Sequence, residues 1–413
     1  MVALVVFGCA AGGGDLAARE AQADQRPGVV VNRAPIDQFI GRLAKAAGDP
    51  GDQPLRVAVF GDSHTAADLW TGVLRRMLQG RYGDGGRGFV QPEKQGPGGN
   101  PGYRFGTALY AGTGRGAEGM GLFGPGGAGL CGAVEAGTLT VEPKALVGPG
   151  RLRLFLYSSQ GAGVRVELPW KTEELPPSLA PEVRLPVYDV PAGAPVALRL
   201  TPLGSGQFCH LGLEMERVGA GVRVDALAVN GARLGTLGKL LDSPGGGALA
   251  GLKYDLLVFM YGTNECVDRN LDGAALARDG AAVLGRVRGL SPEAPCVLVG
   301  PPPFGSRRGV ENPNIGVVND AWKAAAAKAG CAFVDLHATL TDGLTLADWL
   351  GRPAVVLERL WQRWDLTLDR ELVEDLQQRG VPVFSGDGVH LARRGYELLG
   401  ALMFALLTTE AEH

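Results

Sequence analysis

The chain has 413 residues, of which 46% are hydrophobic and 20% are charged, and its formal net charge is −3 at pH 7. These values exclude an intrinsically disordered chain and suggest about two domains. They give no sign of a nucleic-acid-binding protein, because Lys and Arg are neither in excess nor clustered. The sequence contains no run of about 18 or more apolar residues, so no internal membrane span is predicted.

The N-terminal stretch "MVALVVFGCAAGGG" is a short apolar run that ends at Gly8-Cys9. This pattern is similar to the end of a bacterial lipoprotein signal, in which Cys9 would carry the lipid. The alternative is an irregular terminus with an unrelated cysteine. We expect an export leader and linker over residues 1–28, and hence a periplasmic protein or a membrane-anchored lipoprotein of a bacterium.

Residues 29–95 begin an α/β pattern. The apolar spacing within 36–43 predicts a helix over 35–47, and the apolar run "LRVAVF" (55–60) predicts a buried strand. A helical pattern follows from about residue 66 to 80. Between strand and helix stands "GDS", which places Ser63 where open α/β sheets bind their ligands. The alternative is that Ser63 or Thr65 merely caps the helix.

Residues 96–219 change the hydrophobic period from helical to two. Gly and Pro separate four segments that alternate apolar with polar residues, at 151–157, 163–169, 196–202 and 210–217. Short alternating strands of this kind predict an antiparallel β-sandwich or jelly roll. We therefore expect an all-β domain inserted into the α/β domain.

Residues 220–413 return to strands that alternate with helices. The predicted strands, with their following turns, lie at 224–231, 254–265, 296–303 and 331–336, and the predicted helices lie at 275–290, 315–330, 342–379 and 391–408. Strands separated by helices predict a parallel sheet that is covered on both faces.

The cysteines and histidines give few further signals. Cys131 and Cys209 both fall in the β region and can pair in an oxidising compartment. Cys296 and Cys331 begin two apolar strands, and we expect them to be buried thiols. No metal site is predicted, because no C-x-x-C pair occurs and the histidines are scattered. Three tryptophans have helical spacing, which favours packing over sugar stacking: Trp349, Trp361 and Trp364.

Polar groups suited to acyl transfer follow the predicted strands. Ser63 follows the first strand, and "SGDGVHLARRGY" brings Asp387 and His390 just before the last helix. A serine hydroxyl needs a base, and an imidazole with an ordinary pKa of about 6.5 can accept and return its proton. Asp387 would orient that imidazole. We predict a catalytic triad of these three residues; the alternative for Asp387 and His390 is a surface ion pair.

An oxyanion hole also needs donors at this edge of the sheet. The candidates are the backbone N–H of Ser63, the backbone N–H of Gly231 and the side-chain amide of Asn264. The alternatives are a turn glycine and an Asx-turn residue. We expect His64 to shape the pocket rather than act as the base, because adjacent side chains rarely face one another. We expect His210 and His337 to be scaffold residues.

The four blocks "GDS", "VNGA", "GTNE" and "DGVH" resemble, in this order, those of the SGNH hydrolases, or GDSL esterase superfamily. The resemblance covers about residues 30–95 and 220–413. It implies a flavodoxin-like α/β fold with five parallel strands, and serine-based ester hydrolysis with no cofactor or metal. "GDSHTAAD", "GDGGRGFV" and the β insert before "VNGA" are further similar to bacterial peptidoglycan O-acetylesterases, which carry a carbohydrate-binding-module-like jelly roll at this place.

The resemblance implies a serine esterase that removes O-acetyl groups from a cell-envelope carbohydrate, foremost peptidoglycan, through an acetyl-serine intermediate. The partner would then be an acetylated glycan. Three alternatives stay open: an O-acetyltransferase that uses the same triad, a general short-chain esterase and a glycan-binding protein. The sequence "DGVHL" favours a hydrolase over a transferase, because the transferases often carry His-Trp after the triad aspartate. The intact Ser, Asp and His set disfavours a binding protein.

Overall fold

The computed structural model describes residues 30–48, 51, 53–92, 103–107, 124–133, 138–143, 150–306, 308–342, 344–351, 356–357, 359–360, 363 and 383–409. The predicted leader with Cys9, and two of the three helical tryptophans, Trp361 and Trp364, lie outside these residues. Within them, no helix combines the length and the hydropathy needed to cross a bilayer.

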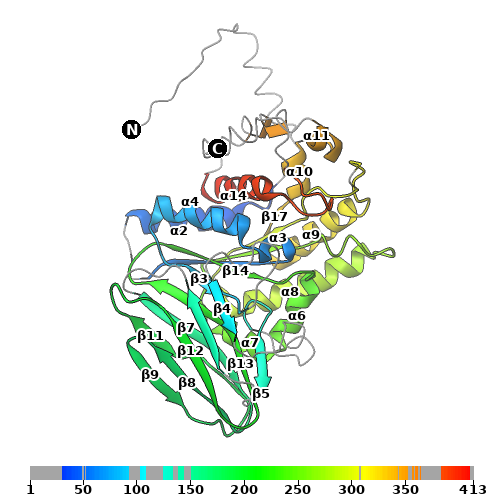
Figure 1. Cartoon of the computed structure of the whole chain (residues 1–413). Helices are drawn as coiled ribbons and strands as arrows, with labels where there is room; N and C mark the ends of the chain where they lie inside the picture. The colour runs from blue at the N-terminus through cyan, green and yellow to red at the C-terminus, as the bar shows by residue number, and fades with distance from the viewer. Residues whose placement is uncertain are drawn as a thin grey trace, which may run out of the picture.

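A six-stranded sheet forms the centre of the α/β part, in the order β1-β17-β16-β15-β2-β14 (Figure 1). Five strands run parallel, and β1 pairs antiparallel with β17. The alternation of parallel strands with helices is confirmed, but the sheet has one more strand than the five predicted. The strands are β1 (Val30–Val31), β2 (Leu55–Gly61), β14 (Val222–Ala228), β15 (Leu256–Met260), β16 (Cys296–Val299) and β17 (Ala332–Val334).

Helices cover both faces of this sheet, as its continuous apolar strands require. Val57, Val59 and Met260 pack with α2, α4 and α14 on one face, and Phe60 and Phe259 pack with α6, α8 and α9 on the other. The helices are α2 (Ala34–Gly48), α3 (Ser63–Ala66), α4 (Leu69–Tyr82), α6 (Leu234–Leu241), α7 (Pro244–Ala250), α8 (Gly273–Leu290), α9 (Ile315–Ala329), α10 (Leu336–Thr341), α11 (Leu346–Gly351) and α14 (Arg393–Thr408).

The helical range predicted at 342–379 is described mainly at α11. Trp349 on this helix is buried, and its ring N–H donates to the carbonyl oxygen of Leu340 at 2.9 Å. Its ring also packs edge-on against Phe384, with centroids 6.0 Å apart. Trp349 is therefore a core residue, as its helical spacing predicted.

The segment between α4 and β14, here called the β insert, forms two antiparallel sheets below the α/β part in Figure 1. A shared apolar core lies between them and contains Leu154, Val166 and Leu200. One sheet has the order β10-β7-β13-β3, with β11 on β7 and β5 on β13; the other has the order β4-β6-β12-β8-β9. Because β3 pairs with β13, the antiparallel sheet begins before the predicted boundary at residue 96.

The strands of the β insert are short and follow one another closely. They are β3 (Gly88–Val90), β4 (Tyr103–Thr107), β5 (Leu130–Ala133), β6 (Leu139–Pro143), β7 (Gly150–Ser158), β8 (Ala162–Leu168), β9 (Lys171–Leu175), β10 (Glu182–Arg184), β11 (Val187–Val190), β12 (Leu198–Gly204) and β13 (Gln207–Arg217). The buried residues of β12 alternate with exposed or half-buried ones, which is the period that predicted these strands.

The chain enters and leaves the β insert through two neighbouring segments. The backbone N–H of Val222 donates to the carbonyl oxygen of Gly83 at 2.9 Å, and that of Gly85 donates to Val222 at 3.1 Å. A Cβ on Gly221 would lie 2.7 Å from the backbone nitrogen of Gly85, so only glycine permits this close approach. The β insert is thus attached through a paired stem.

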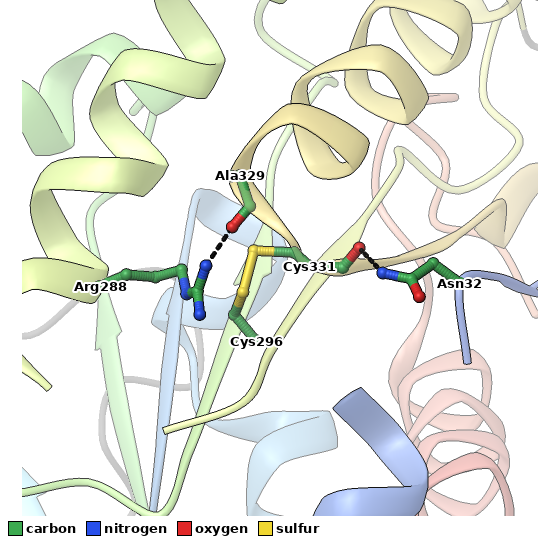
Figure 2. The surroundings of a disulfide bond; sticks show 5 residues. All are labelled: Asn32, Arg288, Cys296, Ala329 and Cys331. Carbon is green, nitrogen blue, oxygen red and sulfur yellow. Dashed lines mark hydrogen bonds between the residues drawn. A yellow bond between two sulfur atoms is a disulfide. The ribbon is translucent and has the colours of Figure 1, made fainter. Parts of the chain in front are cut away.

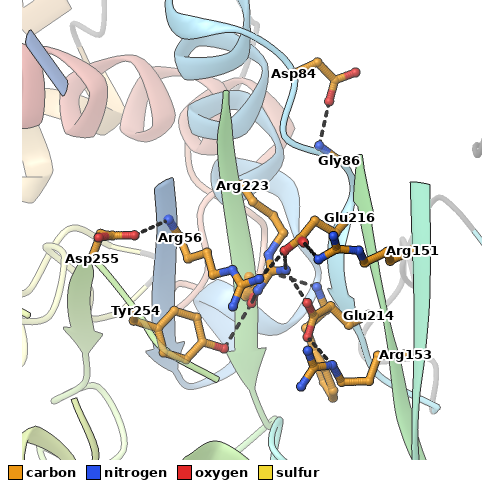
Figure 3. A network of polar contacts seen from close by, with 12 residues as sticks. Arg56, Asp84, Gly86, Arg151, Arg153, Glu214, Glu216, Arg223, Tyr254 and Asp255 are labelled. Carbon is orange, nitrogen blue, oxygen red and sulfur yellow. Dashed lines mark hydrogen bonds and ion pairs between the residues drawn. The ribbon is translucent and has the colours of Figure 1, made fainter. Parts of the chain in front are cut away.

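A buried network of charges joins the β insert to the α/β part beside this stem (Figure 3). At its centre, Arg223 of β14 is fully buried and pairs with Asp225 at 3.0 Å. It also contacts two acidic residues of β13, Glu216 at 2.8 Å and Glu214. Asp225 in turn accepts hydrogen bonds from the Tyr254 hydroxyl at 3.0 Å and from the backbone N–H of Phe89 at 2.9 Å. The orientation of the β insert therefore rests on buried charges that are paired with one another.

Two disulfides are present among the described cysteines. Cys131 of β5 and Cys209 of β13 are direct cross-strand partners and form a disulfide, a pairing that the sequence left open. The prediction for Cys296 and Cys331 was wrong, because they form a second disulfide rather than two thiols. Both stand where neighbouring parallel strands, β16 and β17, enter the sheet, so their Cα atoms are only 4.7 Å apart.

The surroundings of the second disulfide hold its backbone on both sides (Figure 2). The side-chain amide of Asn32 donates to the carbonyl oxygen of Cys331 at 3.1 Å. The guanidinium of Arg288 donates to the carbonyl oxygen of Ala329. The disulfide joins β16 to the residue before β17, and the two hydrogen bonds add contacts to the residue that follows β1 and to α8.

Replacing Cys296 and Cys331 together by serine is expected to lower the free energy of unfolding by about 4 kcal/mol. The bond closes a loop of 35 residues, and removing such a constraint raises the entropy of the unfolded chain by roughly this amount. Urea unfolding under non-reducing conditions measures the difference. An unchanged midpoint in the double variant would contradict it.

His210 of β13 is fully buried, and within the described residues neither of its ring nitrogens has a hydrogen-bond partner. Burial lowers the pKa of His210 to about 3. The unfolded chain therefore binds a proton at this site that the folded chain does not, so acidification from about pH 6.5 toward pH 3 favours unfolding. The contribution is about 1.4 kcal/mol per pH unit.

The variant His210→Leu is expected to lose this contribution. Its free energy of unfolding should fall less between pH 7 and pH 4.5 than that of the wild-type protein. Urea unfolding at the two pH values gives both differences. Equal pH dependence in the two proteins would show that His210 is protonated in the folded state.

Candidate active site

Ser63 stands at the carboxyl end of strand β2, as the sequence predicted, and β2 lies between β15 and β14 in the sheet. It is the first residue of the short helix α3, and Asp62 caps this helix. The turn is tight, because a Cβ on Gly61 would lie 2.4 Å from the hydroxyl oxygen of Thr65. The glycine therefore lets the chain turn directly from strand to helix and leaves the Ser63 side chain half-buried at the rim.

The structure brings Ser63, His390 and Asp387 together. His390 Nε2 lies 2.8 Å from Ser63 Oγ, and His390 Nδ1 lies 2.6 Å from Asp387 Oδ2. With the proton on Nδ1, the imidazole has a free lone pair on Nε2 that can accept the serine proton. This arrangement can perform nucleophilic acyl transfer.

Asp387 is held by a turn that its own side chain organises. Its Oδ1 accepts hydrogen bonds from the backbone N–H groups of Val389 and His390, both at 2.9 Å, and from the hydroxyl of Ser385. Partial burial by itself raises the pKa of Asp387, but the hydrogen bonds from Ser385 and His390 outweigh it and hold the pKa below its usual range. Asp387 is therefore a carboxylate at neutral pH.

His64 lies behind His390 and not against Ser63. Its ring is fully buried, its Nδ1 is 3.1 Å from the Tyr396 hydroxyl of α14, and its centroid is 5.2 Å from that of His390. Burial, followed by the nearby His390, lowers the pKa of His64 to about 3. His64 is therefore an uncharged ring that packs beside the imidazole of His390, which agrees with the expectation that it shapes the pocket and is not the base.

The two other oxyanion candidates stand on the loops that follow β14 and β15. Gly231 is exposed in a turn at φ +76°, and a Cβ there would meet no atom within 4 Å. The side-chain amide of Asn264 donates to the carbonyl oxygen of Ala232 at 2.9 Å and lies 3.4 Å from Asp62 Oδ2. The Asn264 amide therefore lies between Asp62, which precedes Ser63, and Ala232, which follows Gly231.

Three residues of this region were missed by sequence reasoning. Asp62, Tyr396 and Glu265 are all buried. Glu265 Oε1 accepts a hydrogen bond from the backbone N–H of Leu234 at 2.8 Å and so holds the start of α6. Asp62 had a signal, since it precedes a helix and an aspartate is a preferred cap. Tyr396 had none, because its partner His64 is 332 residues away in the chain.

A pocket lies beside the loop that carries Gly231, between α6 and a glycine turn of the β insert. None of the triad side chains lines it, so it is a crevice next to the site and not the site itself. Its lining is mostly apolar and consists of Phe60, Gly61, Pro125, Gly126, Gly127, Leu227, Val229, Ala232, Thr236, Leu237, Leu240 and Tyr261. Over the described ranges, no group of His, Cys, Asp and Glu side chains is arranged to hold a metal ion.

The sequence profile of the GDSL-like lipase/acylhydrolase family matches residues 209–398. No curated protein sequence matches the chain. Among solved structures, one described as "Peptidoglycan O-acetylesterase in action" is similar with a TM-score of 0.67 and 22% identity, over 92% of this chain and 97% of that chain. An acetyl xylan esterase from Geobacillus stearothermophilus is similar at 15% identity and a TM-score of 0.31, over 47% of this chain and 76% of its own.

Proposed function

The chain contains a GDSL-like lipase/acylhydrolase domain and is a carboxylic ester hydrolase, and from this premise we propose that it removes O-acetyl groups from peptidoglycan. The observation that carries the proposal is the hydrogen-bonded series Ser63–His390–Asp387 at the carboxyl end of β2. The choice of substrate is supported by the similarity of nearly the whole chain, β insert included, to a peptidoglycan O-acetylesterase.

The first step transfers the acetyl group to the enzyme. His390 Nε2 takes the proton of Ser63 Oγ while this oxygen attacks the acetyl carbonyl carbon. The negative charge that develops on the carbonyl oxygen is held by the N–H groups of Ser63 and Gly231 and by the Asn264 amide. When the C–O bond to the sugar breaks, the sugar oxygen takes the proton from His390 and leaves as a hydroxyl.

The second step returns the enzyme to its starting state. A water molecule gives a proton to His390 Nε2 and attacks the acetyl-serine, and the same three donors hold the second oxyanion. Acetate leaves as Ser63 Oγ recovers the proton. Asp387 stays ionised throughout, because its hydrogen bonds depress its pKa, and it stabilises the imidazolium in both steps.

The proposal extends to the organisation and location of the protein. We place a flavodoxin-like hydrolase domain in two parts around an inserted β-sandwich domain. The bounds predicted from the sequence are 29–95, 96–219 and 220–413, and the first boundary moves to before β3, because β3 pairs with β13. An exported, periplasmic location is supported by two disulfides, since such bonds persist in oxidising compartments. Membrane attachment through Cys9 stays a prediction from the sequence.

Acetate release from O-acetylated peptidoglycan, O-acetylated xylan and p-nitrophenyl acetate tests the proposal in parallel. We expect release from peptidoglycan at a higher kcat/KM than from xylan. Activity on p-nitrophenyl acetate alone would keep the esterase and overturn the peptidoglycan assignment. Transfer of acetyl to an added sugar acceptor, at the expense of free acetate, would instead identify a transferase. Glycan binding with no release from any ester would identify a binding protein.

A further inference from the structure

We propose that Asp62 is the positioning residue of the oxyanion hole: one buried carboxyl group connects the turn that carries Ser63 to the side chain of Asn264. This inference rests on the proposed esterase function, since it concerns the donors of that same site. It assigns Asp62 a role that neither the triad nor the oxyanion candidates include.

The first oxygen of Asp62 fixes the turn of the nucleophile. Oδ1 accepts a hydrogen bond from the backbone N–H of His64 at 3.0 Å and so caps α3. The carbonyl oxygen of Asp62 also accepts from the N–H of Thr65 at 3.0 Å. These bonds fix the turn around Ser63, which stands between Asp62 and His64, and its N–H is left for a substrate oxygen.

The second oxygen reaches across to the neighbouring strand. Oδ2 lies 3.4 Å from Asn264 Nδ2, whose nitrogen also donates to the carbonyl oxygen of Ala232 at 2.9 Å. One N–H of the amide is thus committed to the loop of Gly231, and the other points toward Asp62 through a long bond. A bond of that length orients the N–H but leaves it available to a developing oxyanion.

Capping alone does not account for an aspartate here. Asp62 is 1% exposed, and no Lys or Arg of the part of the chain that the structure describes is among the groups that shift its pKa. Burial, opposed by the bonds from His64 and Thr263 and reinforced by Glu265, raises the pKa of Asp62 to about 7. Ser or Asn would cap α3 equally well without a buried acid. Only a carboxyl group offers a second oxygen to Asn264.

The variant Asp62→Asn separates the two roles. Its amide oxygen can still cap α3, while its NH₂ group faces the NH₂ group of Asn264, where no hydrogen bond can form. We expect kcat for p-nitrophenyl acetate to fall at least tenfold with KM unchanged, because the lost interaction acts in the transition state. Asp335→Asn is the matched control. Asp335 caps α10 and accepts a bond from the Asn319 amide at 3.0 Å, and its change should leave kcat within twofold.

A double-mutant cycle decides whether Asp62 acts through Asn264. In the Asn264→Ala background, Asp62→Asn should have no further effect on kcat beyond about twofold. An equal fall in both backgrounds, or none in the wild-type background, would overturn the inference. If Asp62→Asn does not fold, Asp62→Ser serves, since it keeps the cap and removes the second oxygen. A wild-type protein without esterase activity, or an Asn264→Ala variant with full activity, would instead refute the proposed site itself.

Discussion

Replacement of Ser63 by alanine is expected to lower kcat for acetyl ester hydrolysis by about 10⁴- to 10⁶-fold. The variant keeps the oxyanion donors and the His390–Asp387 pair but has no atom that can form the acetyl-enzyme. Acetate release from p-nitrophenyl acetate and from O-acetylated peptidoglycan should fall together. Mass spectrometry after rapid quenching should detect an acetylated wild-type protein and no acetylated variant.

Folding should be unaffected, because the Ser63 hydroxyl contacts only His390 among the hydrogen bonds described. Ser205→Ala is the matched control. Ser205 is exposed in the turn between β12 and β13, and its loss should leave kcat unchanged. A folded Ser63→Ala variant that retains more than about one percent of the activity would mean that another residue is the nucleophile.

Replacement of Arg223 by alanine is expected to lower the free energy of unfolding by about 3–5 kcal/mol. The guanidinium is fully buried and is shared by three carboxylates, those of Glu214, Glu216 and Asp225. Its removal leaves these carboxylates in a closed interior with less compensating charge. Urea unfolding monitored by tryptophan fluorescence measures the loss.

An exposed arginine gives the comparison for this effect. Arg199 of β12 pairs with Glu167 at the surface, where their side chains are 60% and 38% exposed, and Arg199→Ala should cost at most about 1 kcal/mol. Arg223→Lys keeps the charge without the planar fork and should lie between the two. A loss for Arg223→Ala no larger than that for Arg199→Ala would show that the network contributes little to stability.

The site could be predicted where a residue had a side chain suited to catalysis and also stood at the end of a predicted strand or before the last helix. Ser63 and Asn264 stand where apolar strands end, and Asp387 and His390 precede the last helix, so the parallel sheet gathers them at one edge. The spacing of Asp387 and His390 within one turn also let their contact be anticipated. The series was therefore predicted from the order of strands and a few polar residues.

The contacts behind the site could not be predicted in this way. Asp62 meets Asn264 across 202 residues and His64 meets Tyr396 across 332, and no periodicity relates such pairs. The second disulfide could have been predicted by combining two features of the sequence. Cys296 and Cys331 each begin a strand, and adjacent parallel strands bring their first residues together. Strand β1 was not predicted, because its two residues are too few to show an alternating pattern.

The paired stem of the β insert has an evolutionary consequence. Because the chain enters and leaves at touching segments, the insert can be exchanged between related genes as a cassette without reordering the host sheet. The charges restrict that exchange, since Glu214 and Glu216 travel with the cassette while Arg223 stays with the host. A foreign insert that lacks acids at these positions would leave the buried guanidinium with Asp225 but without its two partners on β13. We expect β13 and β14 to be inherited together, and productive chimeras to be joined after β14 and not at the stem.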